Sequence, residues 1–346
     1  MKQAVMTAPG KIEFRDVPEP ICHWGEVMME VKVIGVCGSD IHVWHGKHPF
    51  TSYPVVQGHE FSGKVVKVGD GVKNIKKGMK ITALPQVVCG NCGPCRRGLF
   101  NVCEHLAVRG FQATGCASDL YVVPGGMVIP LPDSMTFEQG ALVEPTAVAA
   151  HSTALAGDLT GKNILVVGAA TIGNLVAQAA RCRGAKKILI GNRSGGRKLK
   201  VAEECGLTNT FYIKNESIPD AVKRVFGSEG YQVAFECAGA KEIPKIACET
   251  VDKGGTIVIL GVAEGDTPIP MAILNEHQLT IRGSMMYQHE DYAQAVQWIA
   301  GGQVITDPLV SKQFKFDKYL DAYKYIDEHS KDIMKVMVSL QGKAAK

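Results

Sequence analysis

Four cysteines lie within residues 89–103 and constrain how this chain can fold. They read Cys-x2-Cys-x2-Cys-x7-Cys, and three glycines and a proline between them predict a loop wrapped around a bound group. Four thiolates in one loop are typical of a closed, tetrahedral structural zinc site. An iron–sulfur cluster is the alternative, because Cys-x2-Cys-x2-Cys also begins ferredoxin-like motifs. The proposed ligands are Cys89, Cys92, Cys95 and Cys103.

A second set of metal-binding residue types lies upstream, in residues 35–63. Cys37 comes early in this stretch, and His59 and Glu60 come near its end. A thiolate, an imidazole and a carboxylate leave the fourth position open, as a catalytic zinc requires. Gly38 and Gly58 allow the backbone to bend close to a metal. At arbitrary positions these would be a buried cysteine and surface histidines, but the spacing and the flanking glycines favour a metal site.

The motif Cys-Gly-Ser-Asp-x-His at residues 37–42, followed by Gly-His-Glu at 58–60, resembles the zinc-dependent medium-chain dehydrogenases. The resemblance is closest to their polyol branch, which includes sorbitol (L-iditol) dehydrogenase, and extends from about residue 1 to residue 335. The four-cysteine loop occurs at this spacing in many members. The resemblance also implies that Glu144 lies at the catalytic metal as a fourth or exchangeable ligand. By itself, Glu144 reads as a surface carboxylate.

Composition excludes several other classes of protein. The chain has 346 residues, of which 46% are hydrophobic and 21% charged, as in ordinary globular proteins of two domains. Its net charge is only +4 and its basic residues are scattered, so we expect no nucleic-acid partner. No signal peptide is visible and no apolar run approaches the roughly 18 residues of a membrane span, so we expect a cytoplasmic protein. The eleven cysteines then indicate metal sites and buried thiols rather than disulfides.

The first part of the chain reads as short strands separated by glycine-rich turns. Residues 27–38, 61–72 and 76–85 are the clearest strands, and they predict a partly open β-barrel, which the resemblance makes GroES-like. Residues 137–155 read as a single helix, in which Pro145 would weaken the interior or introduce a kink.

The second part reads as a doubly wound Rossmann domain. A buried strand, a glycine-rich turn and a helix open it at residues 163–185. Gly168 and Gly173 are present in this turn, but Ala170 stands at the middle glycine. Further predicted strands, at residues 186–191, 208–213, 231–239, 254–262 and 278–285, alternate with helical segments. We therefore predict a catalytic domain at 1–149 and 287–346, a cofactor domain at 150–286, and a cleft between them that holds the open metal site.

These features predict an α/β oxidoreductase. A zinc ion would bind the hydroxyl of a secondary alcohol and lower its pKa, while Ser39 relays the proton toward His42 or the ribose hydroxyls. The nicotinamide of NAD(P) would accept the hydride and leave a ketone. A carboxylate ligand, Glu60, in place of a second cysteine resembles the polyol branch. It makes the site suit oxygen-rich substrates such as a polyol or sugar derivative. We expect two zinc ions per chain, one catalytic and one structural.

The expected cofactor residues follow the strands of the second domain. They are Gly168, Ala170, Thr171, Ile172, Gly173, Asn192, Arg193, Arg197, Gly239 and Gly261. No carboxylate ends the second strand at residues 191–198, so nothing there would repel a 2′-phosphate. Arg193, Arg197 and Lys198 stand where that phosphate would lie, which favours NADP while leaving NAD possible.

Other interpretations stay open at this point. An L-threonine dehydrogenase-like enzyme or a simple secondary alcohol dehydrogenase shares similar motifs. A zinc-loop protein that binds nucleic acid or a partner would need a basic surface, for which the chain offers Arg96, Arg97 and Arg109. The substrate pocket could include Trp44, His45, His48, Phe50, Met285 and Met286. The resemblance and a possible hydrophobic sheet edge at residues 256–262 and 278–285 predict a homodimer or homotetramer.

Overall fold

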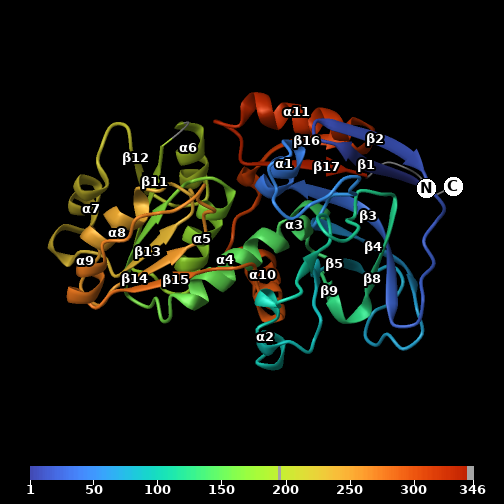
Figure 1. The fold of residues 1–346 in the computed structure, drawn as a ribbon, viewed down its shortest axis with the longest axis horizontal. Helices are drawn as coiled ribbons and strands as arrows, with labels where there is room; N and C mark the ends of the chain where they lie inside the picture. Colours follow the sequence, from blue (N-terminus) through green and yellow to red (C-terminus); the bar gives the residue numbers. More distant parts are fainter. Residues whose placement is uncertain (194–195, 341–346) are drawn as a thin grey trace.

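The computed structural model describes residues 1–193 and 196–340, in which two large sheets are joined by packed helices and two further sheets have two strands each. Figure 1 shows a parallel sheet on the left and a mixed sheet on the right, with helices α4 (Val143–Leu155) and α10 (His289–Ala300) between them. Within the described ranges, no helix is long and apolar enough to cross a membrane.

The mixed sheet positions the first metal-binding set. Its strand order is β16-β17-β3-β4-β5-β9, with β8 also paired to β3. The seven strands are β3 (Glu26–Val36), β4 (Glu60–Val68), β5 (Lys80–Ala83), β8 (Leu120–Pro124), β9 (Val128–Pro130), β16 (Val310–Lys315) and β17 (Lys335–Ser339). β3 and β4 are antiparallel with Gly35 opposite Glu60, and β17 places Val336 opposite Val36. The end of β3 and the starts of β4 and β17 therefore meet at one place.

The parallel sheet has the strand order β12-β11-β10-β13-β14-β15. Its strands are β10 (Asn163–Val167), β11 (Lys187–Asn192), β12 (Asn209–Tyr212), β13 (Val233–Glu236), β14 (Thr256–Ile259) and β15 (Thr280–Gly283). In β10, Ile164 and Val166 pack into one apolar cluster while Leu165 and Val167 pack into another. Because successive side chains of a strand point to opposite faces, β10 is covered on both sides, as in doubly wound folds. The predicted fold class is confirmed.

Helices cover both faces of this sheet (Figure 1). They are α5 (Thr171–Cys182), α6 (Gly196–Glu204), α7 (Ile218–Phe226), α8 (Ile243–Thr250) and α9 (Met271–Glu276). The remaining strands and α-helices precede or follow the parallel sheet in the sequence. They are β1 (Lys2–Ala8), β2 (Lys11–Asp16), α1 (Gly38–Trp44), β6 (Gln86–Val87), α2 (Gly93–Arg96), β7 (Ala107–Val108), α3 (Phe137–Ala141) and α11 (Tyr319–His329).

Residues 137–155 form two helices, so the prediction of a single helix was wrong. α3 begins with a capping box in which Thr136 accepts from the backbone N–H of Gln139, and it ends at Ala141. α4 begins at Val143, which places Pro145 in its first turn. The N–H that proline lacks would have no partner within the helix at this position, so Pro145 does not disrupt α4.

The predicted domain boundaries at 149/150 and 286/287 stay a prediction. α4 runs across the first of them, and residues 341–346 of the predicted catalytic domain lie outside the described ranges. β17 pairs with β3 although the two strands are far apart in sequence, so the end of the described chain joins the sheet formed by its beginning.

Candidate active site

Cys37, His59 and Glu60 come together where β3 ends and β4 begins. Their ligand atoms all lie within 4.8 Å of one another, and His59 and Glu60 are buried. Cys37 is the N-cap residue of α1, directly after β3, whereas Glu60 is the first residue of β4. The antiparallel pairing of β3 with β4 therefore brings together residues that are separated in the sequence by α1 and the loop after it.

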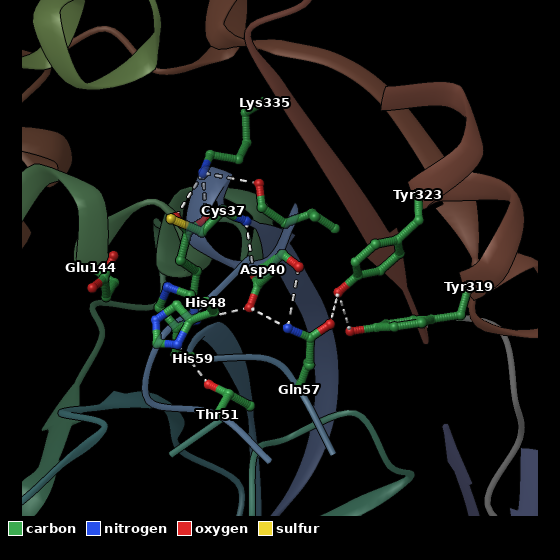
Figure 2. Close-up of polar contacts among 12 residues, drawn as sticks. Cys37, Asp40, His48, Thr51, Gln57, His59, Glu144, Tyr319, Tyr323 and Lys335 are labelled. Carbon is green, nitrogen blue, oxygen red and sulfur yellow. Dashed lines mark hydrogen bonds and ion pairs between the residues drawn. The ribbon is translucent and has the colours of Figure 1, made fainter. Parts of the chain in front are cut away.

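Asp40 holds both Cys37 and His59 (Figure 2). No role for Asp40 was predicted from the sequence. Its carboxylate accepts a hydrogen bond from the Cys37 backbone N–H at 2.9 Å, and its other oxygen lies 3.4 Å from His59 Nδ1. Burial opposes a charge on His59, but the Asp40 carboxylate and the Cys37 side chain raise the pKa of His59 well above its usual range. A carboxylate that orients a ligating histidine is a common companion of metal ligands. Asp40 belongs to the Cys-Gly-Ser-Asp motif, so this motif was the available signal.

The carboxylate of Asp40 is supported in turn by residues from distant elements. Gln57 Nε2 donates to Asp40 Oδ1 at 3.3 Å, and Tyr323 of α11 donates its hydroxyl to Gln57 Oε1 at 2.9 Å. Tyr319 Oη lies 3.4 Å from Tyr323 Oη, and all these side chains are buried (Figure 2). The buried network thus fixes Asp40 from the C-terminal helix.

Glu60 forms a buried ion pair with Lys335, which the sequence analysis also missed. Lys335 Nζ lies 2.6 Å and 2.7 Å from the two Glu60 carboxylate oxygens, and donates to the carbonyl oxygen of Val36 at 3.3 Å. Burial disfavours the charged amine, but Glu60 and the neighbouring acidic groups raise the pKa of Lys335. The signal was a single lysine opening the apolar strand β17. In this arrangement the Glu60 carboxylate is shared between the ligand cluster and Lys335.

Gly35 is required for this ion pair. A Cβ atom at Gly35 would lie 2.2 Å from Glu60 Oε2 and 3.1 Å from Glu60 Cβ. Gly35→Ala is therefore expected to displace Glu60 from Lys335 and to lower the free energy of unfolding by about 3 kcal/mol, the scale for breaking a buried ion pair. Urea unfolding followed by circular dichroism measures this change. Gly126→Ala is the control, because a Cβ there meets nothing within 4 Å; equal stability of the two variants would contradict the prediction.

Glu144 lies in the first turn of α4, buried and outside the three-residue ligand cluster. Its Oε1 accepts a hydrogen bond from the hydroxyl of Tyr287 at 2.6 Å. Burial raises the pKa of Glu144 to about 7. Figure 2 shows Glu144 to one side of Cys37 and His59. Tyr287 comes from the segment before α10 and was not predicted from the sequence. The role of Glu144 as a metal ligand stays a prediction.

The donor set of this cluster fits a zinc ion. It combines a thiol, an imidazole and a carboxylate, the side-chain types that zinc prefers. His59 Nδ1 is buried without a hydrogen bond of good geometry, since its contact with Asp40 is long. A buried imidazole nitrogen without a well-formed bond is the kind of group that a metal site or its orienting carboxylate satisfies.

The predicted proton carriers lie on the exposed side of α1. Ser39 and His42 are both exposed, and no hydrogen bond joins them in the described structure.

Three of the residues predicted to line the substrate pocket contact other parts of the protein. Trp44 Nε1 and His45 Nε2 contact the carboxylate of Asp327 at 2.8 Å and 2.9 Å, so these two side chains bind α11. His48 instead stacks on Phe111 with ring centroids 4.8 Å apart, next to the His59 ring.

The four-cysteine loop is folded as a compact thiol cluster. The four sulfur atoms lie within 4.8 Å of one another, with 3.8 Å between Cys92 and Cys103 and 3.5 Å between Cys103 and Cys89. Tetrahedral zinc with bonds of about 2.3 Å would place its sulfurs about 3.8 Å apart. Backbone N–H groups lower the pKa values of Cys92, to about 6, and of Cys103, whereas burial raises that of Cys95 to about 12. All eleven cysteines are free of disulfide bonds. The distances between the four sulfurs of this loop fit coordination of one ion.

A cavity of about 760 Å³ opens beside the parallel sheet, at the carboxyl ends of its central strands. It is lined by several predicted cofactor residues, namely Gly168, Ala170, Asn192, Arg193 and Gly239. Thr171, Ile172, Gly173, Arg197 and Gly261 are not among its lining residues. A Cβ at Gly173 would lie 1.7 Å from the carbonyl oxygen of Gly168, so glycine is needed for α5 to begin this close to the turn. Doubly wound folds bind dinucleotides in this position.

The proposed 2′-phosphate site is only partly described, because Ser194 and Gly195 lie outside the described ranges. Arg193 is exposed, and its guanidinium lies 3.5 Å from the carboxylate of Glu242, which also lines the cavity. Lys198 also lines the cavity, but it is buried and its amine donates to the carbonyl oxygen of Ser330 at 3.0 Å. Lys198 therefore ties α6 to the end of α11, and Arg193 is the more accessible cation.

Comparison with known proteins agrees with this geometry. The profile of the alcohol dehydrogenase GroES-like domain matches residues 23–133, and that of the zinc-binding dehydrogenases matches residues 171–301. The chain is 34% identical over 326 residues to sorbitol dehydrogenase 1 of Saccharomyces cerevisiae, covering 90% of each chain.

Two solved structures resemble the whole chain. A zinc-binding dehydrogenase from Sinorhizobium meliloti bound to NADP has a TM-score of 0.89 at 29% identity, covering 98% of both chains. An alcohol dehydrogenase from Escherichia coli CFT073 complexed with NADH has a TM-score of 0.90 at 27% identity, covering 98% of this chain and 99% of that one. The chain therefore belongs to the zinc-binding dehydrogenases with a GroES-like domain, in their polyol dehydrogenase-like branch, and is an oxidoreductase that acts on CH–OH groups.

Proposed function

We propose that this protein interconverts a secondary alcohol of a polyol or sugar derivative and the corresponding ketone, with NAD(P) as the hydride carrier. The observation that carries the proposal is the cluster of Cys37, His59 and Glu60, with a further buried carboxylate, Glu144, beside it. Carboxylates at a thiol–imidazole site make it more favourable to oxygen-rich substrates. The sorbitol dehydrogenase to which the chain is similar supports this substrate class.

Each residue of the site has a defined task in this proposal. Cys37, His59 and Glu60 would hold zinc, with Glu144 as an exchangeable ligand, and the ion would supply the Lewis acidity that makes a hydroxyl easier to deprotonate. Asp40 orients Cys37 and His59 through the contacts described above. Ser39 accepts the proton of the substrate hydroxyl and passes it toward His42 and solvent.

A substrate panel tests the proposal directly. The purified protein is incubated with sorbitol, xylitol, L-threonine and 2-butanol in the presence of either cofactor, and reduction of the cofactor is followed by absorbance. We expect the highest kcat/KM with a polyol. A higher value with L-threonine or with 2-butanol would replace the polyol assignment by one of the two alternative dehydrogenase activities. No turnover with any alcohol would contradict the proposed function.

NADP is the cofactor that we propose for this enzyme. Arg193 at the cavity is exposed, and its ion pair with Glu242 spans 3.5 Å at the surface. Such a surface pair contributes about 0.2–1 kcal/mol. A charge-assisted contact from Arg193 to a 2′-phosphate is worth about 1.5–3 kcal/mol, so the phosphate would displace Glu242. The solved relatives carry NADP in one case and NADH in another, so kinetics must decide.

Arg193→Ala is expected to erase most of the preference for NADP, raising its KM about 10- to 100-fold. The KM for NAD should stay nearly unchanged, because only the 2′-phosphate is lost as a partner. Steady-state kinetics with both cofactors measures the effect. Glu242→Gln is the matched control: removing the competing carboxylate should lower the KM for NADP. A wild-type kcat/KM that is higher for NAD would contradict the assignment.

We further propose two zinc ions per chain, one in each cluster, and assembly into a dimer or tetramer. β15 lies at the edge of the parallel sheet, where its backbone groups are available to pair with another chain. The proposed partners are a small-molecule substrate and a second copy of the chain. The cytoplasmic location stays a prediction from the sequence.

A further inference from the structure

A short segment, residues 284–288, connects the parallel sheet to α10 and carries Tyr287 to Glu144. We call it the crossover segment. Met286, at its centre, has a φ of 49°. This left-handed conformation is uncommon for residues other than glycine and persists only where the surroundings hold it. The contacts that hold the crossover segment therefore decide where the Tyr287 hydroxyl lies.

Asn101 supplies the main contacts to the crossover segment from the four-cysteine loop. This side chain is buried, two residues before Cys103. Its Nδ2 donates to the carbonyl oxygen of Met285 at 2.7 Å and lies 3.3 Å from His151 Nε2, while its Oδ1 accepts from Gln288 Nε2 at 2.7 Å. Both amide hydrogens and the oxygen of Asn101 are thus engaged. Asn101 binds the crossover segment on either side of Met286 and Tyr287.

Neighbouring contacts complete this attachment. Gln86 Nε2, in β6 before the four-cysteine loop, donates to the carbonyl oxygen of Tyr287 at 2.9 Å. His151 Nδ1 lies 2.8 Å from Asp291 Oδ2, which also accepts from the backbone N–H of Gln288. His151 and Glu144 are seven residues apart on α4, and so lie on the same face of that helix. The crossover segment is therefore held between the four-cysteine loop and the helix that carries Glu144.

We propose that Asn101 is a positioning residue that couples the four-cysteine loop to the active site. It holds the crossover segment in the conformation that directs the Tyr287 hydroxyl onto Glu144, although its own side chain contacts neither Glu144 nor the Cys37 cluster. The four-cysteine loop thus has a role in catalysis besides stabilising the fold. The kinetic part of this inference rests on the proposed function, whereas the structural part does not.

The kinetic test is a double-mutant cycle with the metal-loaded enzyme. Asn101→Ala is expected to lower kcat about tenfold, the scale for losing buried hydrogen bonds that orient an active-site group. Cofactor KM values should not change, because the cofactor cavity is lined by other residues. Tyr287→Phe alone should lower kcat similarly. In the Tyr287→Phe background, Asn101→Ala should add less than a twofold effect, because both changes remove the same arrangement. Full additivity of the two effects would overturn the proposal.

The structural test does not depend on turnover. Hydrogen exchange measured by mass spectrometry should show about tenfold faster exchange in peptides covering residues 284–288 when Asn101 is replaced by Ala. The matched control is Asn91→Ala, at an exposed position of the same loop; it should leave exchange and kcat unchanged. Unaltered exchange in the Asn101 variant would overturn the proposal. If the wild-type protein turned over no alcohol, the proposed function would fail while this measurement would still decide the role of Asn101.

Discussion

Replacing Cys37 by Ser is expected to abolish turnover while lowering the melting temperature only slightly. A serine hydroxyl is a much weaker zinc ligand than a thiolate, so the Cys37 cluster would lose its ion. Cys37 is only partly buried, and its backbone N–H keeps its bond to Asp40 in the variant. The α1 helix and the strands around it should therefore stay folded. Full activity in the variant would show that the cluster is not the catalytic centre.

Replacing Cys95 by Ser is expected to destabilise the protein far more than replacing Cys37 by Ser, and it serves as the comparison for that variant. Cys95 is buried among the other sulfurs of the four-cysteine loop, where a metal contributes directly to folding. We expect a marked fall in melting temperature. Elemental analysis should give about two zinc equivalents for the wild type and about one for each variant. A wild-type protein with iron in place of zinc would restore the iron–sulfur alternative for this loop.

Replacing Ser39 by Ala is expected to reduce kcat about 100-fold or more, the usual scale for losing a positioned proton carrier. Ser39 lies in the first turn of α1, two residues after Cys37, and is exposed toward solvent. We propose that a substrate hydroxyl held at the Cys37 cluster reaches its oxygen. Steady-state kinetics across neutral pH measures the effect.

Ser39→Thr is the control for this prediction, because it keeps the hydroxyl group and should retain most of the activity. Thermal melting should be nearly the same for wild type and both variants, since Ser39 is exposed and makes no buried contact. A kcat for Ser39→Ala equal to that of the wild type would remove Ser39, and with it the route to His42, from the proton transfer.

The sequence was most informative where a site is assembled from residues close together in the chain. The four cysteines span residues 89–103, and Cys37, His59 and Glu60 span residues 37–60, so their spacing and the glycines around them predicted both clusters. The parallel sheet was predicted because predicted strands, such as the buried apolar run of β10, alternate with helical segments along this part of the chain. The Rossmann and GroES-like classes followed from these local signals and from the resemblance that they supported.

Only the tertiary structure revealed the partners of these residues. Lys335 meets Glu60 from 275 positions away, Tyr287 meets Glu144 from 143 positions away, and Asn101 meets Met285 from 184 positions away. No spacing rule predicts such pairs, because they depend on which strands and helices pack together. The division of residues 137–155 into two helices also depended on context, since a proline in a first turn is favourable and one in an interior is not. The sequence by itself therefore determined the ligand types and the fold class, whereas strand pairing and helix packing decided what orients the ligands.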